Sequence, residues 1–73
     1  MNKAGAELVF DVAQDPDGGY TASCLNEDIF TEADSWDELR TKVRDAVEAF
    51  YFDSPSPRAI RLHMVRDELL TPA

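Results

Sequence analysis

The chain has 73 residues, a formal net charge of −8 and an apolar fraction of 44%, which predict one small folded domain spanning 1–73 and argue against bulk disorder. So acidic a balance argues against direct nucleic-acid binding, and no apolar run approaches the roughly 18 residues of a membrane span. The segment MNKAGAELVF lacks the long hydrophobic core of a signal peptide, so a cytoplasmic protein is expected. A lone cysteine, Cys24, in an apolar alternation fits a reducing compartment.

The acidic residues are unevenly distributed along the chain. Residues 1–35 contain eight acidic side chains and one basic side chain, Lys3, whereas the remainder is nearly balanced. A negative first half would attract and steer a basic protein partner. The alternative interpretation is that the charge serves only solubility. Because a chain of this length buries little surface, self-association is also expected.

The first half of the sequence predicts three strands. Residues 1–6 show no periodicity and are expected to form a frayed terminus. Residues 7–13 alternate, with Leu8, Phe10 and Val12 on one side, which is typical of a half-buried strand. The run DPDGG over 15–19 is a strong turn signal and predicts a hairpin into a second strand over 20–25. A short third strand is expected over 29–33.

A single long helix is predicted over 35–52. Ser35 and Glu38 have the spacing of a capping box, and acidic residues in the first turn suit the helix dipole. At 100° per residue, one apolar arc collects Trp36, Leu39, Val43, Ala46, Val47 and Phe50. The prolines at 55 and 57 end the helix.

A fourth strand is predicted over 58–66, and residues 67–70 either extend it or form one turn. The element order β-β-β-α-β indicates an α+β fold with one helix on one face of a four-stranded mixed sheet. The simplest strand order is 3-2-1-4. The helix is then expected to cover Leu8, Phe10, Val12, Tyr20, Ala22, Cys24, Ile60, Leu62 and Met64.

The opposite face of this sheet is the candidate partner-binding surface. It mixes apolar and polar side chains, and nothing left in the chain would cover it. The candidate residues are Val9, Asp11, Arg61, His63 and Val65. Thr21, Ser23 and Leu25 are expected on the same face.

No catalytic, cofactor or metal site is predicted. His63 is the sole histidine and has no second histidine or cysteine to join it in binding a metal. Asp15 and Asp17 resemble the start of a calcium loop, but the later ligands are missing, so a hairpin turn is the better interpretation. A nuclease-like carboxylate set of Asp11, Glu48 and Asp67 would not converge, because Glu48 falls on the helix side opposite the sheet.

Two stretches carry a resemblance to a known family. The run DPDGGYTA over 15–22 and the run FTEADSWDEL over 30–39 resemble the HicB-like antitoxin superfamily, whose members have an acidic "DGGY" hairpin and a "TEGDT" entry into the helix. The similarity spans about 7–70. It is closest to small stand-alone members with an "IRLH.VRDE" ending, here over 60–68, which are sometimes labelled 2-oxoisovalerate dehydrogenase subunits. That label is rejected, because the chain has no thiamine-binding motif and is too small to enclose the cofactor.

The resemblance implies a partial ribonuclease-H-like fold without the nuclease residues. It also implies a protein that masks a small basic RNA-cleaving toxin, HicA, in a toxin-antitoxin pair. Two departures stand out: the segment over 25–29 lacks the family's usual Pro-Gly, and no DNA-binding domain is expected after the last strand. The expected function is therefore a non-catalytic, homo-oligomeric protein-binding module. The alternatives are a stand-alone homo-oligomer or an enzyme accessory subunit of unknown ligand.

Overall fold

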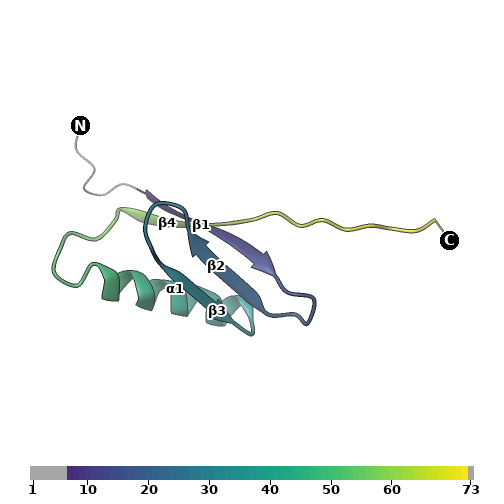
Figure 1. The fold of residues 1–73 in the computed structure, drawn as a ribbon, viewed down its shortest axis with the longest axis horizontal. Helices are drawn as coiled ribbons and strands as arrows, with labels where there is room; N and C mark the ends of the chain where they lie inside the picture. Colours follow the sequence, from purple (N-terminus) through teal and green to yellow (C-terminus); the bar gives the residue numbers. More distant parts are fainter. Residues whose placement is uncertain (1–6, 73) are drawn as a thin grey trace.

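The computed structural model describes residues 7–72, so the frayed terminus expected over 1–6 lies outside the described residues. Within this range the elements are β1 (Glu7–Gln14), β2 (Tyr20–Cys24), β3 (Phe30–Ala33), α1 (Trp36–Phe50) and β4 (Ala59–Met64), in that order (Figure 1). The predicted β-β-β-α-β arrangement is confirmed.

The strands form a mixed sheet in the order β3-β2-β1-β4, as predicted. β2 is antiparallel to both β1 and β3, whereas β1 and β4 run parallel. In the parallel register, Val9 lies opposite Arg61 and Asp11 lies opposite His63. Residues that are more than 50 positions apart in the sequence therefore become neighbours on one face.

The hairpin between β1 and β2 is closed by its acidic turn. The Asp15 amide donates to the Gly19 carbonyl at 2.7 Å, and the Gly18 amide donates to the Asp15 carbonyl at 2.9 Å. Gly18 has a φ of +99°, a conformation that residues with a Cβ rarely adopt. The Asp17 carboxylate accepts from the Gly19 amide at 3.3 Å. These bonds give Asp15 and Asp17 a structural role in the turn.

Helix α1 starts with the predicted Ser35 cap, whereas Glu38 reaches back to the amide of Asp34 and not to that of Ser35, as a capping box would require. The Ser35 hydroxyl accepts from the Glu38 amide at 3.1 Å, and the Glu38 carboxylate accepts from the Asp34 amide at 3.0 Å. At the other end, Tyr51 leaves helical geometry with φ −107° and ψ 27°. The helix thus ends at Phe50, two residues before the predicted end.

The core lies between α1 and the central strands. Its buried residues are Leu8, Phe10, Val12, Ala22, Ile29, Ala33, Leu39, Val43 and Val47. The helix lies nearest to β3 and β2, so it covers the β4 edge of the sheet incompletely, and Ile60, Leu62 and Met64 are only half-buried. Tyr20 and Cys24 on β2, also expected under the helix, are half-buried as well. Phe50, predicted in the apolar arc, is 44% exposed instead.

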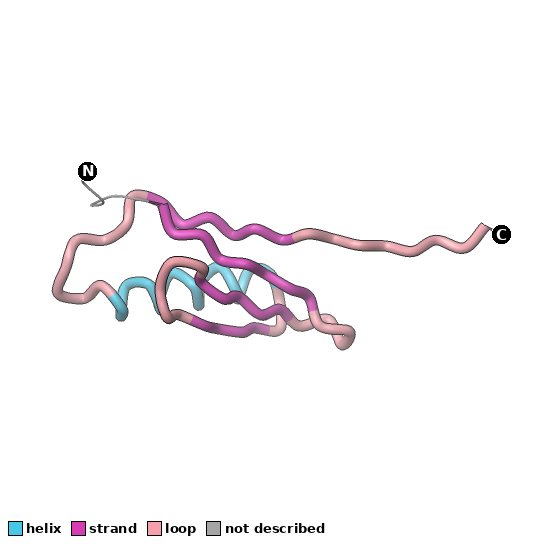
Figure 2. The backbone as a smooth tube through the Cα atoms, turned by 45° about the horizontal axis from the view of Figure 1, so that its top comes forward, coloured by secondary structure: helices cyan, strands magenta, loops and turns pink. Residues whose placement is uncertain are grey.

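After Met64 the chain leaves the sheet. Residues 65–72, here called the arm, run on in an extended course that projects beyond the rest of the molecule (Figure 2). The predicted strand over 58–66 therefore stops at Met64, and residues 67–70 neither pair nor turn. Across the described residues, α1 is too short and too polar to cross a membrane.

Candidate protein-binding surface

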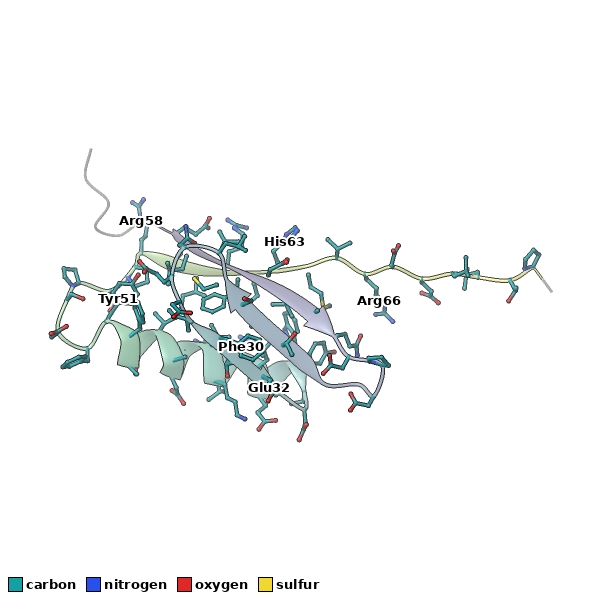
Figure 3. The ribbon with its side chains drawn as sticks, viewed as in Figure 1. Phe30, Glu32, Tyr51, Arg58, His63 and Arg66 are labelled. Carbon is teal, nitrogen blue, oxygen red and sulfur yellow. The ribbon has the colours of Figure 1, made fainter. Side chains whose placement is uncertain are left out.

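The face of the sheet opposite α1, here called the open face, has side chains from all four strands. The register places Phe30 opposite Ser23, Ser23 opposite Asp11, and Asp11 opposite His63, so these four residues form one row across the sheet. Figure 3 shows the two ends of this row, Phe30 on β3 and His63 on β4. The row joins an apolar end to a polar end.

The structure brings together four of the five predicted site residues. Val9 and Asp11 on β1 lie beside Arg61 and His63 on β4, at matching register positions. Val65 lies past the end of β4, at the start of the arm, and is 75% exposed. It is therefore separated from the paired strands that hold the other four.

Arg61 is engaged by a residue that was not among the candidates. Its Nε and Nη2 atoms donate to Oε2 of Glu7 at 3.0 and 2.7 Å. The hydrogen bond from Arg61 holds the pKa of Glu7 below its ordinary value of 4.5, and the same bond raises the pKa of Arg61. The β1 alternation already placed Glu7 on this side, but only the parallel β1–β4 register shows the pairing.

Two exposed apolar residues at the β2–β3 end of the open face were also not among the candidate partner-binding residues. Phe30 is 61% exposed and Leu25 is 68% exposed. The Leu25 amide donates to the Val9 carbonyl at 2.9 Å, which fixes the chain beyond the end of β2. Exposed aromatic and aliphatic side chains that are held by a rigid sheet are typical anchors of protein interfaces. Phe30 lies three positions before the inward-facing Ala33, so the alternation of side chains along β3 already predicts that Phe30 faces outward.

Beside the open face lies an open hollow with a volume of about 540 Å³ and a predominantly acidic lining, here called the acidic hollow. It is formed by the β1–β2 turn, β3 and the start of α1. Its lining residues are Asp15, Asp17, Gly19, Tyr20, Glu32, Ala33, Asp34 and Lys42. Lys42 donates to the Glu32 carbonyl at 3.3 Å and lies 3.5 Å from the Glu38 carboxylate. Four carboxylates therefore share the hollow with one lysine that is already paired.

Glu32 connects the two surfaces. It lies on β3 (Figure 3), opposite Thr21 in the register, and its side chain faces outward. It is also one of the residues that line the acidic hollow. An incoming protein could thus contact Phe30 and the carboxylates together. The open face and the acidic hollow are best treated as one continuous candidate site with an apolar part and an anionic part.

The residues considered for metal or nuclease chemistry do not assemble. Asp11 and Asp67 border one hollow beside the arm, whereas Glu48 borders a different one between α1 and β4. Among residues 7–72, no group of three or more histidine, cysteine or acidic side chains is arranged to hold a metal ion.

Comparison with known proteins assigns the chain to a family. It is 36% identical over 61 residues to a UPF0150 protein of Thermotoga maritima, covering 84% of this chain and 86% of that protein. It is also 40% identical over 47 residues to a UPF0150 protein of Archaeoglobus fulgidus, covering 64% of this chain and 71% of that protein. No family model and no solved structure matches.

The fold and the shared length define a small α+β protein, and the chain belongs to the UPF0150 family. The names of these relatives state no activity or partner, and they do not mention HicB. Membership is consistent with a small stand-alone HicB-like protein.

Proposed function

We propose that this protein is a non-catalytic binding module that masks a small basic protein, in the manner of the antitoxin of a HicA/HicB pair. The observation that carries the proposal is the continuity of the acidic hollow with the open face through Glu32. Hydrophobic anchors beside a field of one charge sign are suited to a partner of opposite charge.

The charge distribution supports a basic partner over a neutral one. All four acidic residues of the hollow, Asp15, Asp17, Glu32 and Asp34, belong to the strongly acidic first half of the chain. Complementary fields raise the rate of encounter and suppress wrong partners. The role of such a module is to cover its partner, which requires a shaped and charged surface and no reactive group.

A binding role also agrees with the arrangement of the candidate catalytic groups. Asp11, Glu48 and Asp67 lie on three different elements, and Glu48 lies on the helix side of the sheet. His63 is exposed at an edge strand. General acid–base and metal-assisted chemistry both need such groups to converge on one point.

The test uses the product of the neighbouring gene, which is expected to be a short basic protein. We expect it to bind the chain tightly, with an affinity that falls as salt is raised. Asp15→Asn, Asp17→Asn and Glu32→Gln combined should weaken binding about tenfold or more and flatten the salt dependence. Calorimetry over a range of salt concentrations measures both effects.

A matched control removes three charges elsewhere. Asp45→Asn, Glu48→Gln and Asp53→Asn are exposed positions outside the acidic hollow and should change the affinity less than about twofold, because surface charges beyond a Debye length are screened. Equal losses in the two triple variants would contradict the proposed site. A neighbouring gene product that does not bind, or whose growth arrest is not relieved by this chain, would contradict the proposed function.

A further inference from the structure

The arm exposes apolar side chains with no cover from the rest of the molecule. Leu69 is 96% exposed and Leu70 is 76% exposed. Figure 1 shows the arm running straight out past the β1–β2 hairpin. Single exposed leucines are common on protein surfaces, but an adjacent pair on a projecting extended segment is a surface suited to docking.

A groove of complementary character lies on the helix side of the sheet. Because α1 sits nearer β3 and β2, it leaves a hollow of about 250 Å³ against β4. The floor of this hollow is apolar, and its sides include two arginines. Its lining residues are Arg40, Val43, Arg44, Ile60 and Leu62.

This groove continues into a second hollow of about 250 Å³, which shares Arg44 and Ile60 with the first and adds Val47, Glu48, Ser56 and Pro57. The acidic Glu48 lies in this second hollow, so the acidic residues of a docked segment are placed at the arginines of the first hollow. The two hollows together offer apolar space alongside the half-buried inner side chains of β4. Within the described residues, Arg44 is in none of the ion pairs. The groove thus combines uncovered apolar surface with a positive charge that has no partner.

We propose that the arm of one copy lies in the groove of a second copy, and that the exchange is reciprocal and forms a homodimer. In an extended arm Asp67 and Leu69 project from one side and Glu68 and Leu70 from the other. The side that faces the groove therefore places one leucine on the apolar residues and one carboxylate toward Arg40 and Arg44. The arm offers acidic and apolar side chains, and the groove offers arginines and apolar side chains, so the two are complementary in charge and in hydrophobicity. Exchange of an identical element gives a closed twofold interface at low cost.

The geometry favours a second copy over the same chain. The groove lies alongside Ile60 and Leu62, behind the point where the arm leaves β4. To reach its own groove, the arm would have to reverse direction just after Met64, whereas residues 65–72 run on from β4 in an extended course without a turn (Figure 2). A straight arm instead reaches outward to another molecule.

The experiment measures the mass of the full-length chain in solution. Sedimentation equilibrium should return twice the 8.2 kDa chain mass. Leu69→Asp with Leu70→Asp, the arm variant, should raise the dimer dissociation constant at least about a hundredfold. The arm lies outside the core, so this variant should keep the circular dichroism spectrum of the native chain.

A groove variant, Arg40→Glu with Arg44→Glu, should likewise be monomeric, whereas Arg58→Glu, a control outside the groove, should remain dimeric. The decisive sample is an equimolar mixture of the arm variant and the groove variant. One copy then supplies an intact arm and the other an intact groove, so a heterodimer should form although neither variant dimerises alone. A monomeric native chain, dimers that survive both variants, or a mixture that stays monomeric would each overturn the proposal.

Discussion

Arg61 is the residue whose role changed most between sequence and structure. Its guanidinium donates two hydrogen bonds to the Glu7 carboxylate, and both side chains lie on the open face. The pair neutralises two charges at the β1–β4 edge of that face. The negative charge left for a partner therefore lies toward Asp11, Glu32 and the acidic hollow.

The Glu7–Arg61 pair predicts a specific pH dependence. Because the folded pKa of Glu7 is lowered from 4.5, its stabilising effect is fully present above the unfolded pKa and is lost as pH falls through the folded pKa. Glu7→Gln should therefore lower stability at neutral pH and make no difference in strong acid. Urea unfolding of both proteins across this range measures the gap.

The pair is exposed, so the gap should be small and should shrink with added salt. Glu48→Gln is the control, since Glu48 is in none of the ion pairs among residues 7–72. A gap for Glu7→Gln that persists unchanged into strong acid would show that the pairing does not stabilise the fold.

At the scale of elements, α1 depends on its first turn. The Ser35 hydroxyl and the Glu38 carboxylate satisfy the Glu38 and Asp34 amides, which would otherwise lack partners. The hydrogen bond from the Asp34 amide also lowers the pKa of Glu38 below 4.5, with a further contribution from Lys42. At neutral pH the cap is thus fully formed, and it weakens in acid.

Ser35→Ala should destabilise the protein by about 1 kcal/mol, because it leaves the Glu38 amide without its acceptor. Ser54→Ala, in the loop after the helix, should change stability by less than about 0.5 kcal/mol. Thermal and urea unfolding of the two variants compare them directly. Equal effects would mean that the hydroxyl of Ser35 does not cap the helix.

Most elements could be predicted from local pattern because their causes are local. The alternation of apolar residues predicted β1, the DPDGG turn predicted the hairpin, and the spacing of Ser35 and Glu38 predicted the start of the helix. The predicted C-terminal ends of α1 and β4 were wrong, for different reasons. Tyr51 turns out of the helix while its amide still bonds the Val47 carbonyl, and β4 stops where its register with β1 ends, at Val12 and Met64.

At the scale of the whole molecule, what could not be predicted depended on how elements sit against each other. The offset of α1 toward β3 leaves Ile60 and Leu62 half-covered, and no periodicity in either segment encodes that offset. The Tyr51 hydroxyl donates to the Glu27 carboxylate at 3.2 Å, which ties the helix end to the β2–β3 connection. The acidic hollow likewise needs three separate elements to meet.

The fold therefore presents two distinct surfaces that share no lining residue. The open face with the acidic hollow is suited to a basic partner, and the groove beside β4 is suited to the arm of a second copy. Because the surfaces do not overlap, a dimer joined through its arms would still offer two partner sites. Two linked sites increase avidity where one partner assembly can reach both.

If a basic partner binds the open face and the acidic hollow, nuclear magnetic resonance should show the contact residue by residue. Titration of the isotope-labelled chain with the neighbouring gene product should shift the amide signals of Asp17, Phe30 and Glu32. The outer face of α1, at Thr41 and Asp45, should stay unchanged. Shifts confined to that helix face, or no shifts at all, would show that the partner does not bind the open face and the acidic hollow.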